Sequence, residues 1–194
     1  VRLGEKVVNK ANQNDGFHPS DDISCSVIYF REPRKLMIFT GPPVNPSDDT
    51  MFTGLLKQFE GKKIICGATT ADMVAREWGE TITDTTQIID PDLPPVSYMD
   101  GVELITEGIL TLSKASELLK KIDPNALPGK GPADEVVRHL LESDEIHFLV
   151  GTHINAANQD PTLPVELELR RTVVHRIART LEERFLKEVT MRFF

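Results

Sequence analysis

The chain has 194 residues, of which 40% are hydrophobic and 27% are charged, and its formal net charge is −8. This length suffices for one domain, or for one domain with a remnant of another, that buries a real core. The acidic balance argues against nucleic-acid binding, because backbone phosphates require clustered Lys and Arg. No apolar run approaches the roughly 20 residues that span a bilayer, so no transmembrane segment and no membrane partner are predicted.

The first predicted element is an amphipathic helix over residues 1–14. Apolar residues at Leu3, Val7, Val8 and Ala11 share one helical face, which indicates that the helix packs on another element. The chain starts at Val1 without an initiator Met or a signal-peptide pattern, and this suggests a fragment.

Residues 18–31 form the most informative stretch of the chain. A polar turn ends in two adjacent carboxylates, Asp21 and Asp22, and leads into an apolar run with strong β propensity that predicts a strand. A divalent cation is the usual partner of carboxylates at the mouth of a strand, since Mg²⁺ and Mn²⁺ take one or two protein carboxylates plus water. An Asx-type turn before a strand is the alternative interpretation of the same two residues.

The sequence of this stretch, HPSDDISCSVIYFR, resembles the closing motif of PPM-type protein phosphatases, in particular the bacterial stage II sporulation protein E family. In that family an Asp-Asp or Asp-Asn pair enters the final strand, and its first Asp binds a catalytic metal. The resemblance implies that Asp21 is a ligand of Mn²⁺ or Mg²⁺ in the intact parent protein. It also implies that residues 1–33 are the last helix and strand of a phosphatase domain. The parent would then remove phosphate from Ser or Thr of a phosphoprotein substrate.

The other metal ligands of such a phosphatase have no counterpart before Asp21. They are an early Asp and Asp-Gly pairs on other strands, and two-metal catalysis needs carboxylates from several strands. We therefore expect no phosphatase activity, no catalytic residue and no bound cofactor in this chain alone.

From residue 34 onward, short apolar runs alternate with helical patterns. Strands are predicted at 36–40, 63–66, 101–106 and 146–150, with a final edge strand at 189–193. Helices are predicted at about 48–59, 70–78, 109–122, 132–142 and 164–186. This alternation predicts an α/β domain over 34–194, with a mostly parallel sheet and helices on both faces, in a three-layer, Rossmann-like arrangement. Three of the strands are apolar throughout, as strands buried on both faces should be.

Two further segments carry more specific predictions. The helix at 48–59 should turn its large apolar residues to the core: Met51, Phe52, Leu55, Leu56 and Phe59. The run at 81–89 is rich in β-forming residues and is followed by chain-breaking prolines at 91, 94 and 95.

Three predicted strands end in loops of similar character, and the candidate binding residues lie there: Gly41, Gly67, Thr69, Thr70, Thr152 and Asn155. Ligands of open α/β sheets gather outside the carboxyl ends of the strands. Glycine allows close backbone approach, and Thr hydroxyls with N–H groups at a helix start can hold an anion. These loops predict a small anionic ligand. Alternatively, Thr69 or Thr70 caps the helix and Gly67 makes room for packing.

The predicted function is that of a regulatory domain, which binds a small molecule or a partner and tunes the phosphatase. The alternative is an independent enzyme that acts on a phosphorylated or carboxylated small molecule at the same loops. The sequence shows no paired catalytic constellation, which favours the first function. Cys25 and Cys66 lie in apolar runs and are predicted to be reduced core residues of a cytoplasmic protein.

Overall fold

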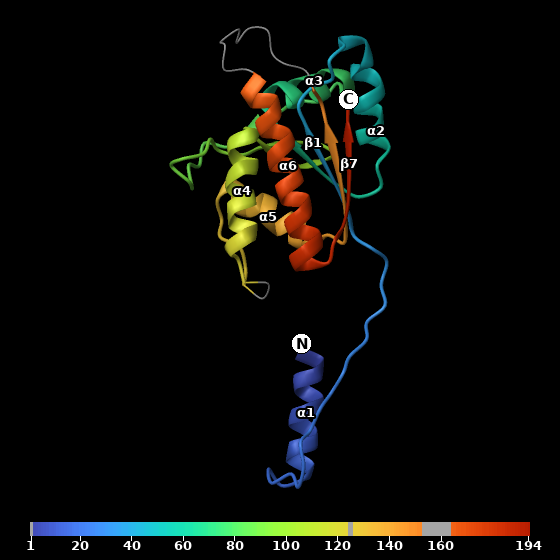
Figure 1. The fold of residues 1–194 in the computed structure, drawn as a ribbon, viewed down its shortest axis with the longest axis vertical. Helices are drawn as coiled ribbons and strands as arrows, with labels where there is room; N and C mark the ends of the chain where they lie inside the picture. The colour runs from blue at the N-terminus through green and yellow to red at the C-terminus, as the bar shows by residue number, and fades with distance from the viewer. Residues whose placement is uncertain (1, 124–125, 153–163) are drawn as a thin grey trace. The chain divides into compact units, whose positions relative to one another are not determined.

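A computed structural model describes residues 2–123, 126–152 and 164–194. The chain divides into two compact units, residues 1–32 and 33–194 (Figure 1).

The first unit contains one helix, α1 (Arg2–Asn14), and an irregular segment that continues to Glu32. The strand predicted after Asp22 does not form, because a strand needs a hydrogen-bonded neighbour and no described residue pairs with this segment. None of its described residues is buried, and Cys25 is exposed, contrary to prediction. Tyr29 and Phe30 are 79% and 89% exposed. This unit therefore has apolar surface but no core of its own.

The second unit is built on one seven-stranded sheet in the order β3-β4-β5-β2-β1-β6-β7. The strands are β1 (Lys35–Thr40), β2 (Lys62–Cys66), β3 (Thr83–Asp84), β4 (Ser97–Met99), β5 (Val102–Thr106), β6 (Glu145–Val150) and β7 (Glu188–Phe193). Five of them run parallel: β5, β2, β1, β6 and β7. β4 is antiparallel to β5 and to β3. The predicted α/β class with a mostly parallel sheet is confirmed.

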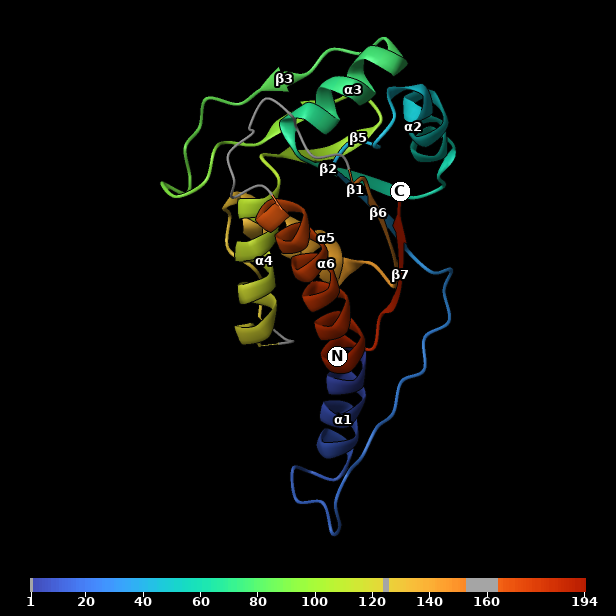
Figure 2. The ribbon, with the colours of Figure 1, turned by 45° about the horizontal axis from the view of Figure 1, so that its top comes forward.

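Helices cover both faces of this sheet (Figures 1 and 2). One face carries α2 (Asp49–Gln58), which follows a short 3₁₀ turn at Pro46–Asp48, and α3 (Ala68–Trp78). The other face carries α4 (Ile109–Lys121), α5 (Pro132–Glu142) and α6 (Pro164–Phe185). Strand β1 shows why both layers form: Ile38 packs in the cluster with α4, α5 and α6, whereas Phe39 packs in the cluster with α2 and α3. A strand buried on both faces is apolar at successive positions.

Two local predictions need correction. On α2, Phe52 and Leu56 are buried as expected, but Met51 and Leu55 are 56% and 40% exposed, because the helix buries only the narrow row of positions spaced three and four residues apart. The β-rich run at 81–89 contributes only the two residues of β3, and its partner β4 was not predicted. Gly79 ends α3 in the left-handed conformation (φ 73°), which glycine adopts without strain.

Among the described helices, none is long and apolar enough to span a membrane.

Candidate ligand site at the carboxyl edge of the sheet

The carboxyl ends of the five parallel strands lie along one edge of the sheet. Thr40 of β1 is in register with Cys66 of β2 on one side and with Val150 of β6 on the other. The three loops predicted to hold a ligand therefore leave adjacent strands and lie side by side. Their adjacency could not be deduced from the sequence, because strand order is set by tertiary packing.

The loop after β6 is held by the end of the chain. Both the backbone N–H and the hydroxyl of Thr152 donate hydrogen bonds to the carbonyl oxygen of Phe194, each at 2.7 Å. The Thr152 hydroxyl therefore donates its hydrogen bond within the fold and helps to hold the end of the chain. Asn155, the other predicted binding residue of this loop, lies outside the described residues.

The loops after β1 and β6 are packed closely against each other. A Cβ atom added at Gly151 would lie 2.1 Å from the carbonyl oxygen of Pro42 and 2.2 Å from that of Gly41. Arg170 of α6 donates from Nη1 to the Gly151 carbonyl oxygen at 3.4 Å. Gly41 is needed for the same packing, because a Cβ on it would lie 2.7 Å from the Gly151 carbonyl oxygen, and its φ of 79° also favours glycine.

The loop after β2 leads directly into α3. Gly67 is the N-cap residue of the helix, so the alternative in which Thr69 or Thr70 caps it is wrong, and no side chain caps this helix start. Thr70 is 1% exposed and its Oγ1 lies 3.2 Å from the place of a Cβ on Gly67, whereas Thr69 is exposed. Gly67 thus makes room for the Thr70 side chain, and Gly108 in turn makes room for Gly67, since a Cβ on Gly108 would lie 3.2 Å from the Gly67 Cα. The first N–H groups of α3 face the carboxyl edge without a side-chain acceptor.

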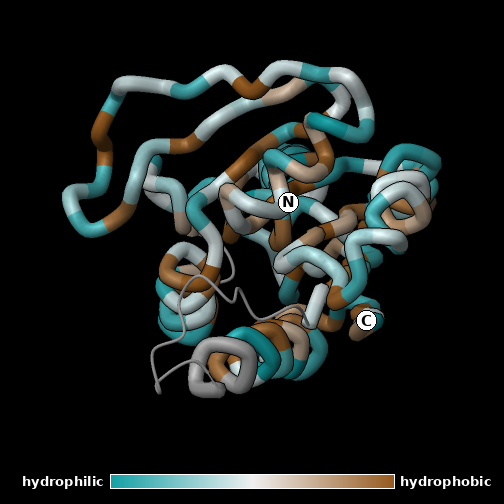
Figure 3. The backbone as a smooth tube through the Cα atoms, turned by 90° about the horizontal axis from the view of Figure 1, so that it is seen from above, coloured by the Kyte–Doolittle hydropathy of each residue, from teal (hydrophilic) through white to brown (hydrophobic). Residues whose placement is uncertain are grey.

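A cleft of about 600 Å³ begins at this helix start. Its walls come from the first turn of α3, the end of β5, and the long connection between α3 and β5, which projects beyond the packed elements (Figure 3). The lining residues are Ala68, Ala71, Asp72, Ile82, Asp84, Thr85, Pro94, Pro95, Ser97, Ile105, Thr106 and Glu107. None of the predicted binding residues that the structure describes is among them: Gly41, Gly67, Thr69, Thr70 and Thr152.

Among the described residues, the charged side chains that line the cleft are the carboxylates of Asp72, Asp84 and Glu107, with no Lys, Arg or His beside them. Asp84 accepts a hydrogen bond from the Ser97 hydroxyl at 2.7 Å, and Glu107 accepts one from the N–H of Leu110 at 3.2 Å. A cleft lined by one sign of charge concentrates the field of that sign. The cleft thus favours a ligand group that is positively charged or donates hydrogen bonds.

Metal-ligating side chains do not gather in the described part of the chain: no group of three or more His, Cys, Asp or Glu could hold a metal ion there. Asp21 is exposed, and its Oδ1 accepts the N–H of Asp22 at 2.8 Å. The residues around Asp21 therefore do not make a complete metal site by themselves.

The thiol at the end of β2 is not a nucleophile. Burial raises the pKa of Cys66 to about 12, with a smaller opposing effect of the neighbouring Thr106 hydroxyl. The thiol is protonated near neutral pH, and a protonated thiol is unreactive.

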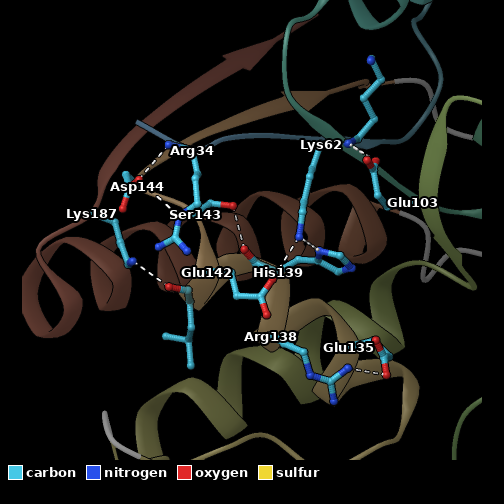
Figure 4. Close-up of polar contacts among 12 residues, drawn as sticks. Arg34, Lys62, Glu103, Glu135, Arg138, His139, Glu142, Ser143, Asp144 and Lys187 are labelled. Carbon is cyan, nitrogen blue, oxygen red and sulfur yellow. Dashed lines mark hydrogen bonds and ion pairs between the residues drawn. The ribbon is translucent and has the colours of Figure 1, made fainter. Parts of the chain in front are cut away.

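The amino edge of the sheet holds a polar cluster of a different kind (Figure 4). The Lys62 ammonium at the start of β2 donates to Glu142 of α5 at 3.0 Å and lies 3.4 Å from Nδ1 of His139. Burial, and then the charge of Lys62, lower the pKa of His139, so its imidazole is neutral near pH 7 and can accept from Lys62. These contacts hold α5 against the start of β2, so this polar cluster has a structural role.

No protein-family model, no curated protein and no solved structure matches the chain. Sequence reasoning found the edge and the helix start but missed the carboxylate wall. A weak signal for that wall was the β-rich run at 81–89, which contains Asp84. The antiparallel pairing of Asp84 with Ser97 on β4, which helps to form the cleft, could not be deduced from that run.

Proposed function

We propose that residues 33–194 form a regulatory domain that binds a small molecule in the cleft at the carboxyl edge. We further propose that the chain is the C-terminal part of a bacterial, cytoplasmic protein phosphatase of the stage II sporulation protein E family. The observation that carries the binding function is the cleft of about 600 Å³ between α3, the end of β5 and the connection that joins them. Its volume is within the range of ligand pockets, and it lies outside the carboxyl end of β5, on the edge at which open α/β sheets bind ligands.

The phosphatase proposal rests on the motif that contains Asp21 and is supported by the surface of the first unit. Val27, Ile28, Tyr29 and Phe30 are between 48% and 89% exposed, and such a continuous apolar stretch normally packs against another surface. The remainder of a phosphatase domain would cover it. That domain would also supply the further ligands with which Asp21 binds Mn²⁺ or Mg²⁺.

The proposed ligand is a small zwitterion, such as an amino acid or an amino-sugar phosphate. Its anionic group would bind at the start of α3, where Ala68 lines the cleft and the N–H groups have no side-chain cap. Its ammonium group would pair with the carboxylates of Asp72, Asp84 or Glu107. An anion without an ammonium group would lie beside these carboxylates and offer them no positive charge to pair with.

The test is a thermal-shift screen of amino acids and amino-sugar phosphates against nucleotides and sugar phosphates that lack an amine. A ligand at a hundredfold excess over its dissociation constant stabilises the folded state by roughly 2.7 kcal/mol. Only the amine-bearing compounds should produce this shift. Asp72→Asn should reduce it, because it removes one carboxylate of the cleft, and Glu80→Gln, an exposed position outside the cleft, should not.

A second variant tests the helix start. Ala68→Pro removes one N–H from the first turn, where proline is tolerated, and the preceding Gly67 has ψ 125°, which a following proline accepts. The folded state should keep its stability and lose affinity for the anionic group. If a bound compound were chemically converted, the domain would be an independent enzyme, not a regulatory domain. If none of the compounds bound, both the regulatory and the enzymatic function would be rejected.

A further inference from the structure

The two edges of the sheet differ in how they are protected. At one edge β3 is only two residues long. At the other, β7 (Glu188–Phe193) has six residues in continuous parallel register with β6, and it contains neither a proline nor a bulge. Edge strands are normally shortened, bulged, charged with Lys or covered, because their free N–H and C=O groups pair with other chains. In the described part of the chain the sheet ends at β7. This edge strand is neither short nor bulged.

The free groups of β7 can be assigned. The N–H groups of Glu188 and Phe194 donate to carbonyl oxygens on the β6 side, at 3.0 and 3.1 Å. Because backbone groups alternate along a strand, Val189, Met191 and Phe193 direct their N–H and C=O groups away from β6. Their side chains lie half-buried beside the core cluster of α4, α5 and α6.

The other side chains of β7 lie on the opposite face, which is open here: Glu188, Thr190 and Arg192 are all exposed. Thr190 is close to β6, since its hydroxyl lies 2.7 Å from Nδ1 of His147. One acidic, one neutral and one basic residue therefore alternate along one exposed face of the edge strand.

This order is complementary to itself. We propose that β7 pairs antiparallel with β7 of a second copy of the chain, around a two-fold axis at Thr190. Glu188 then lies opposite Arg192 of the other copy, twice by symmetry, and Val189 lies opposite Met191. Both residues of the Val189–Met191 pair direct their N–H and C=O groups outward, so they form the hydrogen-bonded pairs of an antiparallel ladder.

Other registers fit less well. A shift by one residue places outward groups opposite inward ones. A shift by two residues places Thr190 opposite Arg192 or opposite Glu188 and removes the Glu188–Arg192 pairs, and a shift by four residues places Arg192 or Glu188 opposite itself, where like charges repel. The sequence of β7 thus selects one register, and the partner it fits is a second copy, with one sheet continuing through both molecules.

The experiment is a charge exchange followed by sedimentation velocity with the full chain. The unchanged protein should show a concentration-dependent dimer. Glu188→Arg or Arg192→Glu alone should weaken dimerisation roughly tenfold or more, which is 1.4 kcal/mol or more. The double exchange, Glu188→Arg with Arg192→Glu, should restore it, and the reversal Glu80→Arg, on a surface outside β7, should leave it unchanged.

Hydrogen exchange locates the contact. The amides of Val189 and Met191 should become protected as the protein concentration rises, while those of Glu188 and Thr190 should be protected at all concentrations. A protein that is monomeric at all concentrations would overturn the proposal. So would a dimer that either single reversal leaves intact, or one that the double exchange fails to restore.

Discussion

At the scale of single residues, Gly151 couples the ends of two strands that are far apart in the sequence. A Cβ at this position would overlap the carbonyl oxygens of Pro42 and Gly41, at 2.1 and 2.2 Å. Gly151→Ala should therefore force the two loops apart and destabilise the protein by about 3 kcal/mol, as overpacking does where backbone cannot yield. Urea denaturation would measure the loss as a lower midpoint.

The matched control is Gly54→Ala on α2. No atom lies within 4 Å of a Cβ at Gly54, which is in the helix interior, so alanine should stabilise the protein by about 0.5–1 kcal/mol. An unchanged midpoint for Gly151→Ala would show that the loops can separate without cost.

The glycines and threonines of the strand-end loops show what a sequence can and cannot reveal. Glycines and threonines after apolar runs correctly marked the strand ends, because turn chemistry is local. The roles of Gly41, Thr70 and Thr152 in packing depend on neighbours that no local pattern identifies: Gly41 faces the loop after β6, and Thr152 binds the carbonyl of Phe194. Ligand binding by the predicted residues stays a prediction.

At the scale of elements, one arginine of α6 binds the C-terminal end of α4. Arg184, in the last turn of α6, donates from Nη1 to the carbonyl oxygen of Leu119 and from Nη2 to that of Ile122, the latter at 3.1 Å. These carbonyls belong to the last turn and C-cap of α4, which have no partner within the helix. Arg184→Ala should cost about 1–2 kcal/mol, because hydrogen bonds from a charged donor are lost.

Arg179→Ala on the same helix provides the comparison. Its side chain is 77% exposed and pairs only locally, with Glu183 at 2.8 Å, so its loss should cost less than about 0.5 kcal/mol. Chemical denaturation of both variants measures the difference. Equal effects would mean that Arg184 does not hold the end of α4.

Elements were predictable where their pattern was long or buried on both faces. The five parallel strands and the six described α-helices were found because apolar periodicity persists over enough residues to separate strand from helix. Strands β3 and β4 have two and three residues, too few for a period. The strand expected after Asp22 failed for another reason: its composition is right, but β structure requires a neighbouring strand, and the described residues offer none.

At the scale of the whole molecule, the core belongs to one unit only. No described residue before Leu36 is buried, whereas both faces of the sheet in residues 33–194 are covered. Stability follows buried apolar surface, so residues 33–194 should fold without the first unit. Chymotrypsin offers a direct way to separate them, because Tyr29 and Phe30 are 79% and 89% exposed in a segment without secondary structure.

Limited digestion of the native chain should therefore cut first near Phe30 and leave a resistant fragment that extends to Phe194. This fragment should unfold in one cooperative transition, with a midpoint within about 1 °C of that of the uncut chain, because it retains the whole core. Calorimetry before and after digestion measures this. Cuts inside residues 35–122 at a similar rate, or a clear loss of cooperativity in the fragment, would mean that the first unit contributes to the stability of the α/β domain.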